Sequence, residues 1–240
     1  MTPRLRMLAG PNGSGKTTLA AQLKSDYAVN FYSFLNADIL FAEIAKSNKT
    51  ACPFSIEPQK LADFVKNSTY PDEYKKFFFD GAIVIDDEDY IVFAPRAVNS
   101  YTVAMIADFF KEQFVDRKIS FSFETVFSHP SKINLLKRAQ DAGFRTYMYF
   151  IATESPIINQ NRIADRVSHG GHNVPEEKIY PRYQRCLAQI QVALQYLNRA
   201  YFFDNSGENT VYLAEYSKED GFILHSDLFP QWFNRFVIAE

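Results

Sequence analysis

The segment GPNGSGKT at residues 10–17 satisfies the pattern GxxxxGK[ST], and it constrains the fold more than any other feature of this chain. Glycines in such a loop let consecutive backbone N–H groups point inward, where they can bind phosphate groups. An apolar run at residues 5–9 predicts a strand before the loop, and helix formers at 17–24 predict a helix after it. The sequence therefore predicts a nucleotide-binding P-loop between a strand and a helix.

The loop residues have distinct expected roles. Lys16 is expected to reach the β- and γ-phosphates of ATP, and the Thr17 hydroxyl is expected to bind Mg²⁺. The helix that begins near Lys16 adds the positive end of its dipole to this attraction for phosphate. We expect ATP to be bound by the following residues: Gly10, Pro11, Asn12, Gly13, Ser14, Gly15, Lys16, Thr17 and Thr18.

Composition narrows the class of protein further. The 240 residues include 26 Lys and Arg against 28 Asp and Glu, a formal net charge of −2, which argues against a broad surface that binds nucleic acid. No apolar stretch approaches the roughly 20 residues that a membrane span needs. Cys52 and Cys186 show no disulfide framework or zinc spacing. We therefore expect a cytoplasmic protein with neither a nucleic-acid nor a membrane partner.

Strands and helices are expected to alternate along most of the chain, which predicts an α/β fold with a mostly parallel sheet flanked by helices. Strands are expected over residues 5–9, 31–37, 119–123, 144–152 and 200–207, with a terminal hairpin around residues 218–221. Helices are expected over residues 17–24, 38–47, 59–67, 97–116, 131–142 and 183–198. Residues 1–240 are predicted to form a single domain, into which the segment 49–118 is inserted.

Two carboxylates follow predicted strands. In an open parallel sheet the carboxyl ends of the strands face the ligand crevice, so both side chains are candidates for chemistry there. Asp38 could accept the proton of an acceptor hydroxyl or hold a metal-bound water. It could equally belong to the Asn/Asp cap of the next helix. Glu124 and Thr125 could bind a substrate hydroxyl, and a solvated strand end is the alternative.

Arg162 and Arg166 are four residues apart and would share one face of a helix. Arginines in a closing lid would stabilise charge on the transferring phosphoryl group and exclude water. A solvated basic face is the ordinary alternative. The nearby His169 and His172 lack the further ligands that a zinc site needs.

The run from Ile83 to Asp87 ends in two carboxylates and resembles a Walker B strand, the mark of a hydrolysing ATPase. The acidic residues continue through Asp89 into a second β-rich run. That pattern fits a hairpin with an acidic turn better.

Several segments together resemble the zeta toxin family of P-loop kinases, particularly its shorter chromosomal members. The matching segments are GPNGSGKTT at 10–18, NAD at 36–38, FETVFSHPSK at 123–132, AGFRTYMYFIAT at 142–153, NRIADRVSHGGHNVPEEKIYPRY at 161–183 and FFDNSG at 202–207. They cover about half of the chain, in order and with compatible spacing. The region 49–118 has no counterpart that we can match in the compact members.

The resemblance implies a P-loop kinase-like domain that transfers the ATP γ-phosphoryl group to a hydroxyl of a nucleotide sugar, typically UDP-N-acetylglucosamine. Asp38 resembles the family's catalytic base, and Glu124 resembles a substrate-pocket carboxylate. Arg162 and Arg166 resemble the lid arginines, with Arg182 as a further candidate. By position, Asn205 and Ser206 border the adenine. An antitoxin protein is an implied partner.

Two other functions remain open at this stage. An ATPase that uses hydrolysis for a conformational or regulatory role would employ Asp86 or Asp87. A regulatory module would use nucleotide binding to control its association with a protein partner.

Overall fold

The computed structural model describes residues 2–171 and 173–238, and it divides into two compact units. The first unit comprises Met1–Phe34 and Lys118–Glu240, and the second comprises Leu35–Arg117. The insertion predicted over residues 49–118 overlaps the second unit. That the whole chain acts as a single domain with an insertion stays a prediction.

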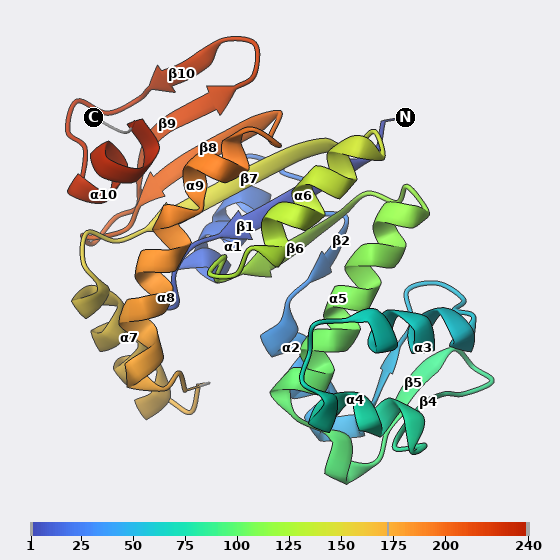
Figure 1. Ribbon diagram of the computed structural model, residues 1–240. Coiled ribbons are helices and arrows are strands. Elements are labelled where there is room, and N and C mark those ends of the chain that lie inside the picture. Colours follow the sequence, from blue (N-terminus) through green and yellow to red (C-terminus); the bar gives the residue numbers. More distant parts are fainter. Residues whose placement is uncertain (1, 172, 239–240) are drawn as a thin grey trace. The chain divides into compact units, whose positions relative to one another are not determined.

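The first unit is built around a seven-stranded sheet of order β10-β9-β8-β7-β1-β6-β2 (Figure 1). Its strands are β1 (Arg4–Ala9), β2 (Ser33–Leu35), β6 (Phe121–Thr125), β7 (Arg145–Ala152), β8 (Arg199–Asp204), β9 (Val211–Ser217) and β10 (Gly221–Leu224). The pairs β6-β1, β1-β7 and β7-β8 are parallel, whereas β9 and β10 form the antiparallel terminal hairpin. The predicted α/β class is confirmed.

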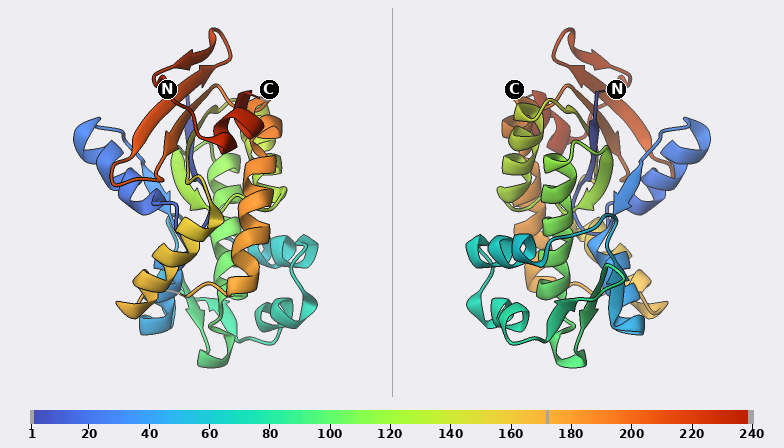
Figure 2. Two further views of the ribbon diagram at one scale, coloured as in Figure 1. Left: turned by 90° about the vertical axis from the view of Figure 1, so that its left-hand side faces the viewer. Right: turned by 90° about the vertical axis from the view of Figure 1, so that its right-hand side faces the viewer.

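Helices cover both faces of this sheet. The helices of this unit are α1 (Lys16–Asp26), α6 (Ser131–Asp141), α7 (Pro156–Ser168), α8 (Glu176–Ala188), α9 (Ile190–Leu194), α10 (Gln231–Phe233) and a π-helical segment, Asn234–Ile238. Figure 2 shows α1 on one face and α6, α8 and α9 on the other. Apolar side chains of β1 and β7 explain this layering, because both strands are almost entirely buried.

One predicted helix differs from the structure. The helix expected over residues 183–198 begins earlier, at Glu176, and is divided into α8 and α9. Pro181 is the sixth residue of α8, where it removes the backbone donor that would otherwise bond the carbonyl oxygen of Glu177.

The second unit combines helices with a small sheet. Its helices are α2 (Ala37–Ser47), α3 (Pro58–Asn67), α4 (Asp72–Phe79), the 3₁₀ turn Pro95–Ala97 and α5 (Ser100–Asp116). Its antiparallel sheet has the order β3-β5-β4, with β3 (Lys49–Ala51), β4 (Ile83–Ile85) and β5 (Tyr90–Phe93). The predicted hairpin is confirmed, whereas β3 and α4 were not predicted from the sequence.

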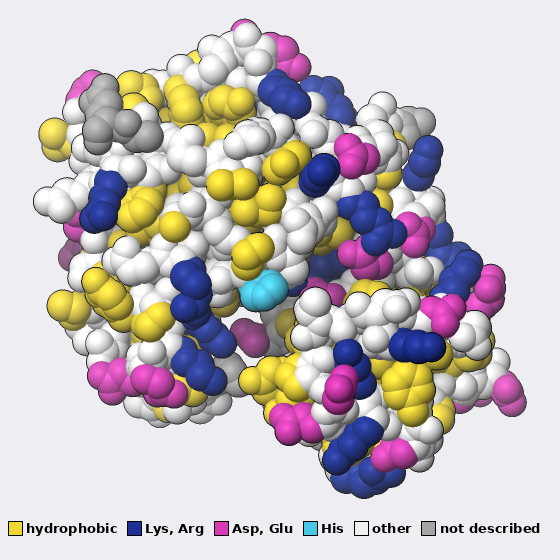
Figure 3. All heavy atoms as spheres, in the orientation of Figure 1, with side chains coloured by type: hydrophobic (Ala, Val, Ile, Leu, Met, Phe, Trp, Pro, Cys, Tyr) yellow, Lys and Arg dark blue, Asp and Glu magenta, His cyan; other side chains and the backbone are white. Residues whose placement is uncertain are grey.

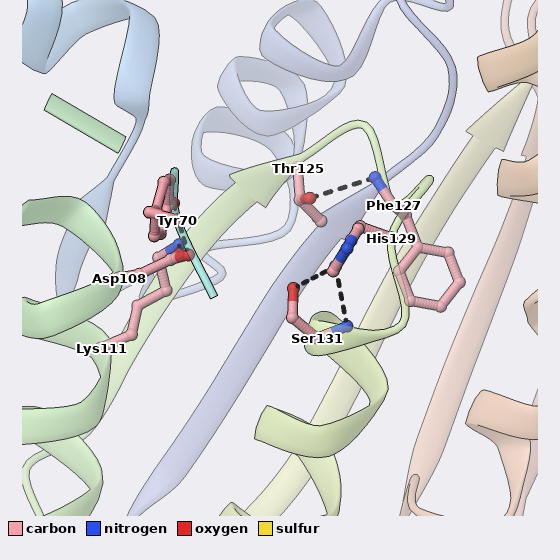
Figure 4. A network of polar contacts seen from close by, with 7 residues as sticks. All are labelled: Tyr70, Asp108, Lys111, Thr125, Phe127, His129 and Ser131. Carbon is pink, nitrogen blue, oxygen red and sulfur yellow. Dashed lines mark hydrogen bonds and ion pairs between the residues drawn. The ribbon is translucent and has the colours of Figure 1, made fainter. Parts of the chain in front are cut away.

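Buried aromatic rings and one polar cluster hold the second unit together. Phe93, Phe109 and Phe110 are at most 2% exposed, so core packing accounts for much of the aromatic content of this segment. In the polar cluster, the Tyr70 hydroxyl donates to Asp108 Oδ2 at 2.9 Å, and Lys111 Nζ lies 2.5 Å from Asp108 Oδ1 (Figure 4). Burial and the neighbouring Asp108 raise the pKa of Tyr70.

Two features of the surface bear on the class of protein. Among the described residues, no helix combines the length and the apolar character needed to cross a bilayer. Acidic and basic side chains are interspersed over the face shown in Figure 3, in keeping with the net charge of −2.

Candidate active site

The P-loop follows β1 directly, and its backbone packs closely against the backbone of β7 and α7. Gly10 has φ +154° and Gly13 has φ +75°. A Cβ atom on Gly10 would lie 2.0 Å from the carbonyl oxygen of Ile151, and one on Gly13 would lie 2.6 Å from that of Asn159. Larger residues would therefore displace the loop from β7 and α7, which explains the glycines at these two positions.

Lys16 is the first residue of α1 and is held close to the loop. Its side chain is buried, and Nζ donates to the carbonyl oxygens of Gly10 at 3.0 Å and Pro11 at 2.8 Å. Gly15 precedes the helix and has no side chain that could cap the first backbone N–H groups. The Lys16 ammonium group and the amino end of the 11-residue helix α1 therefore lie at the same loop. This arrangement favours the binding of phosphate.

Two asparagines donate to carbonyl oxygens of the loop. Asn159 of α7 is fully buried, and its Nδ2 lies 2.6 Å from the carbonyl oxygen of Asn12. Asn205, just after β8, donates from Nδ2 to the carbonyl oxygen of Ser14 at 2.9 Å. These two hydrogen bonds hold the carbonyl oxygens of Asn12 and Ser14 and so help to fix the shape of the loop. Asn159 was not among the predicted site residues.

Glu124 lies beside the metal-binding hydroxyl that the motif predicts. β6 pairs with β1 so that Glu124 is level with Leu8, just before the P-loop. Thr17 Oγ1 donates to Glu124 Oε2 at 3.1 Å, although the two residues are 107 positions apart. The structure therefore brings together two oxygen groups that the sequence had assigned separately.

The segment after Glu124 forms a local turn (Figure 4). Thr125 Oγ1 accepts a hydrogen bond from Phe127 N at 3.0 Å, and Phe127 has φ +57°. His129 Nδ1 accepts from Ser131 N at 3.2 Å at the start of α6. These hydrogen bonds shape the chain between β6 and α6, within the segment 123–132 that resembles zeta toxins.

Asp38 occupies the first turn of α2, in the second unit. Asn36 is the N-cap, and its Oδ1 accepts from the backbone nitrogens of Asp38 at 2.9 Å and Ile39 at 3.3 Å. The Asp38 carboxylate is therefore not the cap, and the residue is exposed. Its assignment as catalytic base stays a prediction.

The two candidate lid arginines lie on α7 and have different surroundings. The Arg162 guanidinium donates to the carbonyl oxygens of Asn205 at 2.7 Å and Gly207 at 3.3 Å. Arg166 is exposed, and a Cβ atom on Gly171 would lie 2.5 Å from its Cγ. Arg182 is half-buried on α8. Arg162 thus supports the loop after β8 in this structure.

The Walker B interpretation of Asp86 and Asp87 is not supported by their setting. Both follow β4, which belongs to the antiparallel sheet of the second unit rather than to the P-loop sheet. Asp86 Oδ1 accepts from the backbone nitrogens of Glu88 at 3.0 Å and Tyr90 at 2.8 Å, as a turn residue does.

The histidines near α7 give no basis for a metal site. His169 lies 3.8 Å from Asp165 Oδ1, and His172 lies outside the described residues. Within the described part of the chain, no three His, Cys, Asp or Glu residues form a group that could hold a metal ion.

A P-loop at the end of a mostly parallel, helix-flanked sheet defines the class of P-loop kinase-like proteins. The zeta toxin family model matches residues 68–217, more than half of the chain, and the chain belongs to this family. The P-loop itself precedes the matched region. No curated protein matches the sequence.

Solved structures share the fold at low sequence identity. A chain of the AvrRxo1-ORF1:-ORF2 complex crystallised with ATP matches with a TM-score of 0.58 and 15% identity, over 93% of this chain and 61% of that chain. The native complex matches with a TM-score of 0.61 and 14% identity, over 98% of this chain and 63% of that chain. A chain from the PezAT chromosomal toxin-antitoxin system of Streptococcus pneumoniae matches with a TM-score of 0.51 and 12% identity, over 100% of this chain and 80% of that chain. This chain therefore spans less than two thirds of the AvrRxo1 chains.

Proposed function

We propose that this protein is an ATP-dependent kinase that transfers the γ-phosphoryl group to a hydroxyl of a nucleotide sugar of the UDP-N-acetylglucosamine type. The observation that carries the proposal is the P-loop with buried Lys16 beside the Thr17–Glu124 pair. Membership of the zeta toxin family and the ATP named for the AvrRxo1 complex support it.

Each residue has a defined task in this proposal. Lys16 exchanges its two loop carbonyls for the β- and γ-phosphates and neutralises part of their charge. Asp38 orients the acceptor hydroxyl and takes its proton. Arg162 and Arg166 of α7 are the candidate lid arginines that would stabilise charge on the γ-phosphate during transfer.

The oxygen groups of Thr17 and Glu124 fit Mg²⁺, which prefers oxygen ligands and retains several waters. Thr17 Oγ1 would hold the ion directly, and Glu124 would accept from one of its waters. When bound, Mg²⁺ supplies charge neutralisation at the phosphates.

Phosphorus NMR tests the reaction. The protein is incubated with ATP, Mg²⁺ and single nucleotide sugars, beside a sample without acceptor. We expect a new phosphomonoester signal only where a suitable acceptor is present. Equal phosphate release in every sample, lost in Asp87→Asn, would instead establish an acceptor-independent ATPase.

Glu124→Gln tests the metal assignment. Loss of an outer-shell carboxylate is expected to weaken the apparent Mg²⁺ affinity by about 10–100-fold, with activity recovered at high Mg²⁺. Thr17→Ser, which keeps the hydroxyl, is the matched control and should resemble the wild type. A Mg²⁺ dependence in Glu124→Gln equal to that of the wild type would refute the role of Glu124.

A protein partner is also part of the proposal. The similar PezAT structure belongs to a toxin-antitoxin system, and the similar AvrRxo1 structures are complexes of ORF1 with ORF2. We therefore propose an antitoxin as the partner of this chain. Co-expression with the product of a neighbouring reading frame and measurement of complex mass would test it.

A further inference from the structure

Arginines occur at the amino ends of β1 and β7. In Figure 1 the amino end of β1 is the end opposite to the P-loop. Arg4 of β1 is level with Arg145 of β7, and Arg6 is level with Tyr147. Residues level with one another in adjacent parallel strands share a face, and alternate residues of a strand do so too. Arg4, Arg6 and Arg145 therefore lie on one face of the sheet.

Arg6 is a buried cation without a counter-ion. It is 8% exposed, and its guanidinium carbon lies 5.1 Å from the ring centroids of both Tyr32 and Tyr147. Its Nε and Nη1 have no hydrogen-bond partner, and no carboxylate among the described residues pairs with it. Aromatic rings and tyrosine hydroxyls offset only part of the cost of burying a charge.

Tyr32 connects this buried charge to the surface. Its hydroxyl accepts from Arg4 Nη1 at 3.2 Å, and its backbone has φ +54°, unusual for a residue other than glycine. Arg6 and Arg4 lower the pKa of Tyr32, which reflects the positive potential at this position. Arg4 is half-buried and Arg145, level with it on the adjacent strand, is exposed.

Arg199 of β8, also level with Tyr147, shows the ordinary arrangement. A hydrogen bond to Tyr201 and the charge of that residue raise the pKa of Arg199, and the charges of Glu215 and Glu219 add to this effect. Arg4, Arg6 and Arg145 have no such carboxylates among the described residues. Three adjacent like charges repel one another, and a bound anion would offset that repulsion.

We propose that Arg4, Arg145 and the Tyr32 hydroxyl form a second anion site, which takes the phosphate group of a small molecule. The guanidinium groups supply the paired N–H donors that match phosphate oxygens, and the buried Arg6, on the same face of β1 as Arg4, adds positive charge. The site is independent of the P-loop and of the proposed transfer reaction.

Calorimetric titration with pyrophosphate tests the site. The full chain carries Lys16→Ala so that the P-loop contributes little, and it is compared with the same protein carrying Arg4→Gln and Arg145→Gln as well. We expect the latter to bind about tenfold more weakly or worse, the loss expected when charge-assisted hydrogen bonds are removed. Both positions are at least partly exposed, so folding should persist; the thermal midpoint verifies this.

The matched control removes two charges elsewhere. The control carries Lys137→Gln and Arg185→Gln in place of the two arginine changes. Lys137 on α6 and Arg185 on α8 are exposed, and these two helices cover the face of the sheet opposite to α1 (Figure 2). This control in the Lys16→Ala background should bind as tightly as Lys16→Ala alone. If pyrophosphate binding were weakened equally in the control, the effect would be due to net charge alone, and the proposal would be overturned. Absence of binding to Lys16→Ala at millimolar pyrophosphate would overturn it too.

Two further titrations distinguish the sources of the phosphate group. Inorganic phosphate and a nucleoside monophosphate are compared at equal concentration. Tighter binding of the nucleotide would indicate that a base stacks on the tyrosines of the site, and equal binding would indicate recognition of the phosphate alone. In either case the Arg4→Gln and Arg145→Gln changes must weaken binding, or the site is not where we place it.

Discussion

Replacing Asp38 with Asn is expected to reduce phosphoryl transfer by about 10²–10⁴-fold, the usual contribution of a general base, while ATP binding persists. The amide keeps the size of the side chain but cannot take the proton of the acceptor hydroxyl. The cap of α2 should survive, because Asn36 Oδ1 bonds the backbone nitrogens of Asp38 and Ile39 rather than the carboxylate. Initial rates of acceptor phosphorylation and calorimetric ATP affinity measure the two properties separately.

The matched control is Glu43→Gln, an exposed carboxylate on the same helix. It removes one negative charge from α2 without touching the expected base and should keep wild-type activity. If Asp38→Asn also kept the wild-type transfer rate, the base would have to be another residue, although the nucleotide site would stand.

Asn159→Asp is expected to weaken ATP binding by about tenfold or more and to lower the free energy of unfolding by about 1–3 kcal/mol. The change converts the Nδ2 donor into an oxygen that faces the carbonyl oxygen of Asn12. Two acceptors then oppose each other in a fully buried position, and the P-loop loses a contact that holds its shape. Nucleotide affinity is measured by calorimetry well below the thermal midpoint, and stability by urea unfolding.

Asn134→Asp provides the control for this substitution. Asn134 is exposed on α6, so the same chemical change should leave both affinity and stability close to wild type. A variant of Asn159 that lost stability but bound ATP normally would show that the asparagine supports the fold without shaping the loop.

The elements of the first unit could largely be predicted because their signals are local. Apolar runs of strand length, helix formers and the glycine after α6 all act within a few neighbouring residues, and β1, α1, α6 and β7 lie close to the expected ranges. Gly143, with φ +87°, ends α6 as expected. Weak local signals explain the elements that were missed. α4 follows a proline and has a largely polar first turn, and the π-helical turn at Asn234–Ile238 has no sequence pattern of its own.

The candidate site was predicted only as separate pieces. The P-loop was recognisable from eight consecutive residues, and the resemblance to zeta toxins extended the assignment to Asp38, Glu124 and the arginines. No spacing rule linked Thr17 to Glu124 or Asn159 to Asn12, which are 107 and 147 positions apart. Arg162 looked equivalent to Arg166 in sequence, yet it bonds the carbonyls after β8.

The P-loop and the alternation of strands and helices can be recognised from the sequence, because both depend on residues that are neighbours along the chain. Which side chains support that loop, and which arginines lie without counter-ions, follows from the three-dimensional arrangement instead. These contacts depend on the order and register of the strands. For example, the register of β1 and β7 places Arg4 level with Arg145. Register is set by packing of the whole sheet, so no local pattern can state it in advance.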